Sequence, residues 1–275
     1  MDCQRRLFNA INSGNKNPNL LASISVCAQA IKLQHALELL ETQTLASFQN
    51  YMKKLYSEAE AEKSKATIRL VKTPEFNKAY TLSHSINFEH PKLLKLEEII
   101  KNQFKEKADS KIIIFTQYRD TGSKISENLN KIPGVRSSVF VGQTKKSHST
   151  NKGEIISGLN QKEQKKLIDD FSQGKINTLV ATSIGEEGLD IPEVNEVIFY
   201  EPVPSAIRKI QRAGRTARLI PGKLKILITK DTRDQSFHYA SISREKKMHS
   251  LIKEIKKDFE DNGKIKSEEK QQNLF

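Results

Sequence analysis

Apolar residues in the first 105 positions recur every three or four places, which is the spacing of one face of an α-helix. Three such stripes run between residues 19 and 59: Leu21, Ile24, Ala28 and Ile31; Ala30, Leu33, Leu37 and Leu40; and Leu45, Phe48, Met52, Leu55 and Ala59. They predict two packed helices, with His35 as a helix contact, and the polar stretch from Glu58 to Lys72 is expected to continue the second. A further helix is predicted from Pro91 through Phe104, so residues 1–105 are expected to be all-helical.

The pattern changes at Lys111, where short continuous apolar runs replace the helical spacing. Five runs follow: Ile112–Phe115, Val135–Val141, Thr178–Ala181, Val197–Tyr200 and Leu224–Ile228. Such runs are typical of strands that are covered on both faces. Three polar segments of helical length lie between them: Ser123–Lys131, Gln161–Ser172 and Ser205–Ala213. This alternation predicts an α/β fold, in which a parallel sheet with helices on both faces is preceded by the all-helical segment.

Local residues predict both ends of the helix at 161–172. Asn160 and Glu163 have the spacing of a capping box at its start, and Gly174 is placed to stop it. Helical spacing returns from Asp234 to Phe259 and predicts a last helix. The charged residues after this helix predict a frayed tail.

Positive charge is in excess and is unevenly distributed. The chain has 46 Lys and Arg against 33 Asp and Glu, which gives a formal net charge of +13. Residues 101–150 carry +6 and residues 201–250 carry +8, whereas lysines that served solubility alone would be spread more evenly. These two blocks indicate a polyanionic partner, and nucleic acid is the polyanion that we favour.

The composition argues against several other classes of protein. No run reaches the roughly 18 consecutive apolar residues that a membrane span needs, and Met1 is followed by polar and charged residues. Cys3 and Cys27 have no second pair, which excludes a disulfide framework and a cysteine-based zinc site. We therefore expect an intracellular, cytoplasmic and nucleoid-associated protein, without membrane contact and without a metal site of its own.

Candidate site residues follow the apolar runs, because ligands of an open parallel sheet bind at the carboxyl ends of its strands. After the first three runs come Thr116-Gln117-Tyr118-Arg119, then Gly142-Gln143, then the segment from Thr182 to Pro192. After the fourth run and its helix come Arg212, Arg215 and Arg218, three residues apart, with Gly214 between the first two. Guanidinium groups on one side of a turn can bind phosphate oxygens. The alternative is that these arginines pair with Glu186 or Glu187.

These stretches resemble the second RecA-like domain of superfamily 2 helicases. The resemblance is carried by QRAGRTAR (211–218), ATSIGEEGLDIP (181–192) and IIIFTQYRDT (112–121). The stretches ISGLNQKEQ and FVGQ narrow it to the Hef and Fanconi-M-type branch of DNA fork helicases. It covers roughly Pro91 to Ile255, and the helical segment before it resembles the tail of the insertion domain of that branch.

The resemblance implies that the chain is divided into four parts. Residues 1–105 would be an incomplete helical insertion, or thumb-like, segment, and residues 106–232 the second RecA-like domain. Residues 233–262 would form a C-terminal helix that packs back, and residues 263–275 a frayed tail.

The resemblance also implies roles for single residues at a nucleotide site that is shared with a first RecA-like domain. Arg215 and Arg218 would be arginine fingers that reach the γ-phosphate of ATP bound with Mg²⁺. The other nucleotide-site residues would be Gly188, Asp190, Gln211 and Arg212. Asp190 would accept a hydrogen bond from a ribose hydroxyl, Gly188 would allow close backbone approach, and Arg212 would brace the motif against Glu187.

A second group of residues would bind the phosphate backbone of one DNA strand without reading bases. Its members are Thr116, Gln117, Gly142, Gln143 and Thr182, together with Lys145 and Lys146 in the basic loop that follows Gln143. Two alternatives stay open at this stage. Thr116 and Thr182 could be simple strand-end caps, and the basic loop could be merely solvated.

Some features of these helicases are missing from the sequence. No stretch fits the P-loop pattern G-x-x-x-x-G-K-[ST], since the nearest, from Ala217 to Leu224, lacks the first glycine and the hydroxyl that binds magnesium. No apolar strand ends in an Asp-Glu pair, and no E-R-K-x-x-x-D nuclease motif is present. A smaller departure is Ala217, where the family usually has glycine. We expect the carboxyl half of a split or truncated helicase, which hydrolyses no ATP alone.

Three hypotheses of function follow. The first is an ATP-dependent DNA helicase or translocase fragment that acts on forked or branched DNA and needs the first motor domain. The second is a non-catalytic nucleic-acid-binding or adaptor module. The third is an RNA-sensing relative of the same branch, which affinity for RNA duplexes would distinguish.

Overall fold

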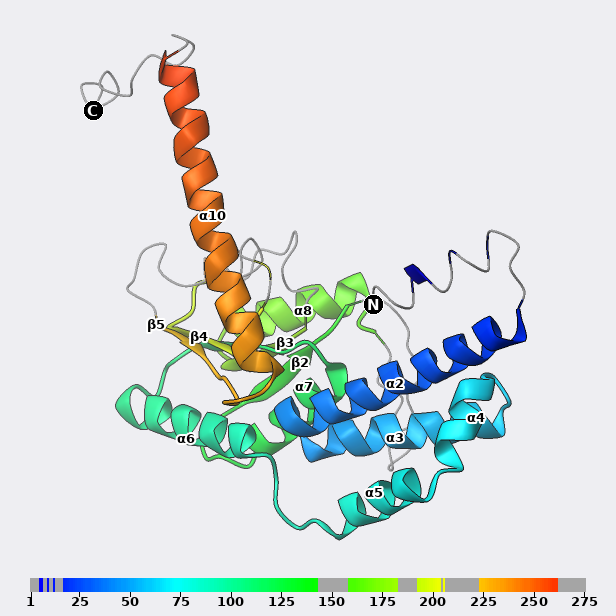
Figure 1. Cartoon of the computed structure of the whole chain (residues 1–275). Helices are drawn as coiled ribbons and strands as arrows, with labels where there is room; N and C mark the ends of the chain where they lie inside the picture. The colour runs from blue at the N-terminus through cyan, green and yellow to red at the C-terminus, as the bar shows by residue number, and fades with distance from the viewer. Residues whose placement is uncertain are drawn as a thin grey trace, which may run out of the picture.

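The computed structural model describes residues 5, 6, 9, 12, 17–142, 158–182, 192–203, 205 and 223–261, with the side chains after residue 257 excepted. Within these ranges the chain forms an amino-terminal group of helices, a five-stranded sheet with helices on both faces, and a long last helix (Figure 1). The predicted α/β class, a parallel sheet with helices on both faces after a helical segment, is confirmed.

Helices α2 (Pro18–Thr42), α3 (Leu45–Glu60), α4 (Lys65–Val71) and α5 (Pro74–Ser85) precede the sheet unit. We call them the helical segment. Side chains of Asn17, Thr44 and Ser64 accept hydrogen bonds from the first turns of α2, α3 and α4, so a polar cap starts each of these helices. A common apolar core joins them, formed by Ala36, Leu39, Phe48, Met52, Leu55, Leu70 and Phe76.

The helical segment differs in three ways from the prediction. The α2 stripes do not form the core, because Leu33, Leu37 and Leu40 are 47%, 53% and 42% exposed, while Ala36 and Leu39 are buried. The second helix stops at Glu60, where Glu62 adopts a φ of 51°, and α4 starts anew. Helix α5 was not predicted. His35 is a helix contact as expected, with its ring 4.7 Å from that of Tyr51 in α3.

Within the described ranges, α2 is the one helix that is long and apolar enough to cross a membrane by length and composition. The count of consecutive apolar residues did not detect it, because polar residues interrupt the run. Three of these are charged, and two of the three pair with other helices: Lys32 Nζ lies 3.0 Å from Glu58 Oε2, and Glu38 pairs with Arg233. Charged side chains in a membrane span are costly.

The sheet consists of β1 (Ile112–Phe115), β2 (Ser137–Phe140), β3 (Thr178–Ala181), β4 (Glu196–Phe199) and β5 (Lys223–Ile226). Their order is β2-β3-β1-β4-β5, and all four neighbouring pairs are parallel. Every predicted strand is therefore present, within two residues of its expected start and end. The carboxyl ends of all five strands lie along one edge.

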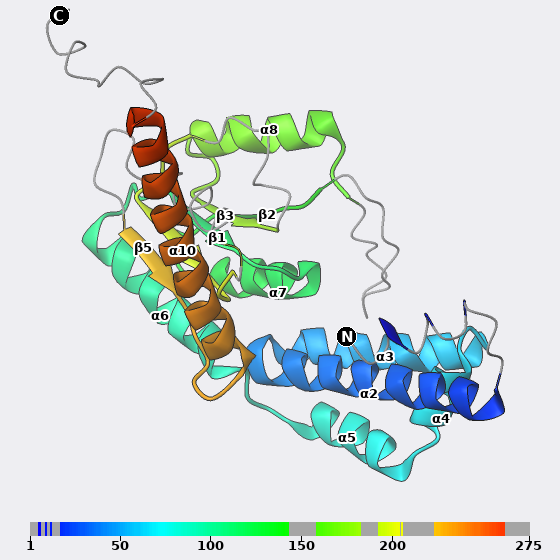
Figure 2. The same ribbon diagram turned by 45° about the horizontal axis from the view of Figure 1, so that its top comes forward.

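Helices cover both faces of the sheet (Figure 2). On one face, α6 (Pro91–Glu106) and α7 (Arg119–Leu129) pack through Leu93, Leu96, Ile100, Ile125 and Leu129. On the other, α8 (Gln161–Ser172) packs through Ile168 and Phe171. Helix α6 therefore belongs to the sheet unit, whose core starts near Pro91. The spacing of apolar residues had placed this helix in the all-helical segment that ends at residue 105.

Helix α8 has the ends that its sequence predicted. The Asn160 side chain accepts from the Glu163 N–H, and the Glu163 side chain accepts from the Asn160 N–H, both within 2.9 Å. Gly174 has a φ of +74°, which a residue without Cβ adopts readily.

The last helix, α10 (Arg233–Asp261), packs back only over its first part. Asp234 and Ser241 are buried, whereas residues 251–257 are all exposed. In both views the helix projects beyond the sheet (Figures 1 and 2).

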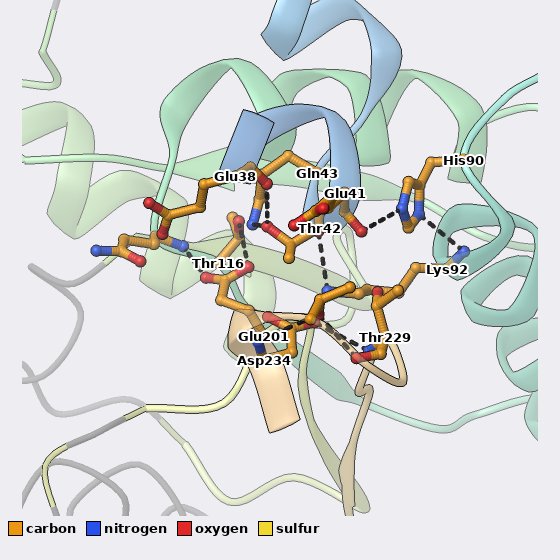
Figure 3. Close-up of polar contacts among 12 residues, drawn as sticks. Glu38, Glu41, Thr42, Gln43, His90, Lys92, Thr116, Glu201, Thr229 and Asp234 are labelled. Carbon is orange, nitrogen blue, oxygen red and sulfur yellow. Dashed lines mark hydrogen bonds and ion pairs between the residues drawn. The ribbon is translucent and has the colours of Figure 1, made fainter. Parts of the chain in front are cut away.

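A buried polar junction joins the helical segment, α6 and α10 (Figure 3). Lys92 Nζ donates to Asp234 Oδ2 at 2.5 Å and to the Thr42 carbonyl at 2.9 Å, and the two charged side chains are 4% and 5% exposed. Asp234 Oδ2 also accepts from the Thr229 N–H at 3.1 Å. The ammonium lies 5.0 Å from the centre of the Tyr200 ring. One ion pair thus holds the end of α2, the start of α6 and the start of α10 together.

His90 lies beside this junction and is held neutral. Its Nδ1 accepts from the Lys92 N–H at 3.1 Å, so its Nε2 donates to the Glu41 carbonyl at 2.9 Å. Burial lowers the pKa of His90 below 6.5, and the charge on Lys92 acts in the same direction, while the Glu41 carbonyl, Asp234 and Glu89 oppose the shift.

We expect His90 to make the protein less stable in mild acid. Because the pKa of His90 is lower in the folded protein, the unfolded chain binds the proton more tightly. The contribution of neutral His90 to the free energy of unfolding is therefore full above about pH 6.5, and it is lost as the pH falls through the folded-state pKa. Urea unfolding of wild type and His90→Asn between pH 7.5 and 5 measures this, because asparagine can still cap α6 but does not titrate. Equal pH dependence of the two proteins would contradict the assignment.

Candidate nucleic-acid and nucleotide interface

The strand order places three of the predicted DNA-binding residues beside one another. Phe140, Ala181 and Phe115, the last residues of β2, β3 and β1, are aligned across the sheet. Gly142, Thr182 and Thr116 follow these strands, so they lie in this order along the carboxyl edge. Backbone hydrogen bonds extend to this level, from the Thr182 N–H to the Phe140 carbonyl and from the Thr116 N–H to the Ala181 carbonyl.

The side chains at this edge differ in their accessibility. Thr116 is fully buried and Thr182 is 4% exposed, whereas Gln117 is exposed. The Thr116 hydroxyl lies 3.4 Å from Glu201 Oε2 and donates to it. Among the predicted residues in the described ranges, Gln117 is therefore the one whose side chain is open to a ligand.

Sequence reasoning missed Glu201, a carboxylate at the ligand edge that is 5% exposed. It lies two residues after the end of β4, and it accepts hydrogen bonds from the Thr116 hydroxyl and from the Gln117 N–H (Figure 3). The signal was present, since an acidic residue after a buried apolar strand must find donors inside the fold. Glu201 holds the end of β4 against the loop after β1.

Arg119 also orders this edge; it belongs to the candidate stretch after the first apolar run, but the sequence suggested no role for it. It begins α7, and its Nη2 donates to the Gly142 carbonyl at 3.3 Å. One turn further, α7 approaches the sheet closely at Gly122, where a Cβ atom would lie 3.3 Å from the Thr116 methyl group. The amino end of α7 is thereby held next to Thr116, at the edge where helix amino ends can attract anions.

Tyr118 joins the same loop to the helical segment. Its side chain packs against the apolar core of that segment, and its ring lies 5.8 Å from that of His35. Burial raises the pKa of the Tyr118 hydroxyl well above its usual value, and the charges of Glu38 and Glu201 add to the effect. Tyr118 is thus a neutral packing residue.

The remaining predicted residues lie outside the described ranges. They are Gln143, Lys145 and Lys146 for DNA, and Gly188, Asp190, Gln211, Arg212, Arg215 and Arg218 for the nucleotide, as well as the alternative partners Glu186 and Glu187. Within the described ranges, no group of three His, Cys, Asp or Glu side chains could hold a metal ion.

Comparison with known proteins identifies the family. A model of the helicase conserved C-terminal domain matches residues 91–220, and a model of an ATP-dependent RNA helicase helical bundle matches residues 4–90. The crystal structure of the Pyrococcus furiosus Hef helicase domain is 44% identical, with a TM-score of 0.65, over 86% of this chain and 47% of that one. The chain belongs to the Hef and Fanconi-M branch of superfamily 2 helicases.

Two curated relatives support the same assignment. An ATP-dependent RNA helicase of Methanocaldococcus jannaschii is 41% identical over 232 residues, which are 84% of this chain and 28% of that protein. An ATP-dependent DNA helicase of Schizosaccharomyces pombe is 37% identical over 224 residues, which are 78% of this chain and 28% of that protein. The chain thus spans less than a third of these relatives and about half of the Hef helicase domain.

Proposed function

We propose that this chain is the carboxyl half of an ATP-dependent DNA helicase or translocase that acts inside the cell on forked or branched DNA, in repair or fork processing. It contributes arginine fingers and part of the grip on the DNA backbone, while a P-loop domain contributes the rest of the ATP site. The observation that carries this proposal is the likeness to the Hef helicase domain, at 44% identity over 86% of the chain.

At the nucleotide, Arg215 and Arg218 would stabilise the charge that develops on the γ-phosphate during its transfer to water. Asp190 and Gly188 would position the ribose, and Gln211 and Arg212 would support the finger motif. The P-loop domain would bind the phosphates and Mg²⁺. The 275 residues contain no P-loop of their own, which supports this division of roles.

At the DNA, the carboxyl edge of the sheet would hold the phosphate backbone of one strand. Gly142, Thr182 and the Gln117 loop lie along this edge, where the exposed amide group of Gln117 can bind a phosphate without reading sequence. Thr116 would act indirectly, since its hydroxyl is buried on Glu201 and fixes the start of the loop. Lys145 and Lys146 would add charge from the adjoining basic loop.

The purified chain is expected to bind DNA in a salt-sensitive way and to hydrolyse no ATP. Fluorescence anisotropy with forked DNA between 50 and 200 mM salt measures the binding, and phosphate release measures the turnover. Affinity should fall steeply with salt, because phosphate contacts release counterions. Binding that is absent at low salt, or ATP turnover by the chain alone, would contradict the proposal.

Replacing Lys145 and Lys146 together by alanine is expected to weaken DNA binding and to reduce the salt slope by about two. The matched control is Lys53→Ala with Lys54→Ala, two adjacent exposed lysines of α3, which is not part of the sheet unit. If wild type and the Lys145/Lys146 variant had equal salt slopes, the basic loop would not be part of the DNA interface.

An RNA substrate is the second candidate, because one relative and the helical-bundle family are described as RNA helicases. The two candidates are separated by comparing the affinity of the chain for forked DNA, linear duplex DNA and duplex RNA of equal length. RNA-binding proteins recognise the A-form shape and the 2′-hydroxyl of RNA. Tighter binding of RNA would favour this candidate over DNA. A non-catalytic adaptor would bind nucleic acid but gain no ATP turnover when a P-loop domain is added.

A further inference from the structure

The loop after β1, residues 116–118, is held at the ligand edge from two directions. From the sheet, Glu201 accepts from the Thr116 hydroxyl at 3.4 Å and from the Gln117 N–H. From the opposite direction, the helical segment contacts the first turn of α7, which directly follows this loop. Gln117, whose side chain is exposed, stands in the chain between Thr116 and the first turn of α7.

The second attachment is a chain of buried side-chain hydrogen bonds. The Thr121 hydroxyl donates to Gln43 Oε1 at 2.9 Å, and it lies 2.8 Å from the Ser47 hydroxyl. The Ser47 hydroxyl in turn lies 2.8 Å from that of Thr44. Gln43, Thr44, Ser47 and Thr121 are at most 3% exposed, so water does not replace these contacts.

The direction of these bonds is determined by counting protons. Each hydroxyl has one proton to donate. Since Thr121 donates to Gln43, the Ser47 hydroxyl must donate to Thr121, and the Thr44 hydroxyl must donate to Ser47. The Gln43 amide group completes the chain by donating to Thr42 Oγ1 at 3.3 Å. Loss of one member therefore leaves a buried neighbour without its partner, which costs free energy.

We propose that Gln43 and Thr121 are positioning residues through which the helical segment holds the loop 116–118 in the geometry that binds nucleic acid. This inference rests on the proposed function. The polar chain ends within one helical turn of the loop, and Tyr118 of the loop also packs into the helical segment. A displacement of the helical segment would therefore move the loop against the strand ends at Gly142 and Thr182.

Variants at Thr121 test the inference at constant shape. Thr121→Val has nearly the same volume but no hydroxyl, whereas Thr121→Ser keeps the hydroxyl. We expect Thr121→Val and Gln43→Ala to weaken forked-DNA binding by about fivefold, and Thr121→Ser to bind within about twofold of wild type. The matched control is Gln103→Ala, because Gln103 is 8% exposed and donates to the Ser110 hydroxyl at 3.1 Å at the opposite edge of the sheet.

Amide hydrogen exchange of the full chain without DNA is the second readout. Exchange at residues 117–122 should be faster in Thr121→Val and Gln43→Ala than in wild type, Thr121→Ser and Gln103→Ala. Unchanged exchange there would overturn the positioning role whether or not DNA binds. Faster exchange with unchanged DNA affinity, or an equal loss of affinity in Gln103→Ala, would overturn the link to binding. Failure of the wild type to bind DNA would instead refute the proposed function and with it that link.

Discussion

Alanine in place of Arg215 or Arg218 is expected to lower ATP turnover by about 10³–10⁵, the range seen for arginine fingers in phosphoryl transfer. The reason is that a guanidinium at the γ-phosphate stabilises charge that develops only in the transition state. The measurement is the DNA-stimulated phosphate release rate of a two-domain enzyme, with a P-loop motor domain of the same branch fused ahead of this chain or supplied as a second chain.

DNA affinity should stay within a few-fold of wild type in these variants, because in our proposal these arginines contact the nucleotide rather than the strand. Arg244→Ala, in α10, is the control arginine for a general loss of positive charge. Loss of DNA binding that parallels the loss of turnover would place Arg215 and Arg218 on the nucleic acid and would contradict the finger assignment.

Replacing Lys92 by methionine is expected to lower the free energy of unfolding by about 3–5 kcal/mol. The change leaves the Asp234 carboxylate, 5% exposed, without the ammonium that lies 2.5 Å away in the wild type. Lys95→Met in the same helix is the control, since Lys95 pairs with Glu98 at 2.8 Å with both side chains more than half exposed. That variant should change stability by less than about 1 kcal/mol. Urea unfolding at pH 7 measures both.

The double variant Lys92→Met with Asp234→Asn separates the unpaired charge from lost packing. Asparagine is neutral and can still accept from the Thr229 N–H, which lies 3.1 Å from Asp234 Oδ2. We expect the double variant to recover a large part of the lost stability, because replacing both members of a buried ion pair often changes the free energy of unfolding little. A double variant as unstable as Lys92→Met would show that the cost comes from the methionine itself.

The sheet was predictable because its strands carry their own signals. Ile112–Phe115 and Thr178–Ala181 are continuous apolar runs, fully buried in the structure, and they matched their strands without error. The Asn160 and Glu163 capping box likewise depends on residues three apart. Such local features determine local structure, and short connections between alternating elements leave few topologies.

The parts that were not predicted depend on contacts between distant residues. The stripe of Leu33, Leu37 and Leu40 has helical spacing, but which face of α2 is buried depends on where α3, α4 and α10 pack. Helix α6 joins the sheet core through contacts that the boundary at 105 did not anticipate. Glu201 and Gln43 act on a loop about 80 residues away in sequence, and no periodicity contains that information.

The candidate site was predicted only in part, because some of its features depend on local sequence and others on contacts between distant residues. The rule that ligands bind at strand carboxyl ends identified Gly142, Thr182 and Thr116, and strand order then placed them side by side. It could not show that the Thr116 hydroxyl is turned toward Glu201 and away from solvent. Arg215, Arg218 and the other nucleotide residues stay predictions, carried by the family resemblance.

The central claim is that this chain provides one wall of an ATP site whose other wall belongs to a P-loop domain. The most direct test is the rate of phosphate release with forked DNA for this chain, for a P-loop domain of the same branch, and for the two together. We predict turnover only in the combination. Turnover by this chain alone, or a combination that binds DNA with no gain in turnover, would contradict the claim.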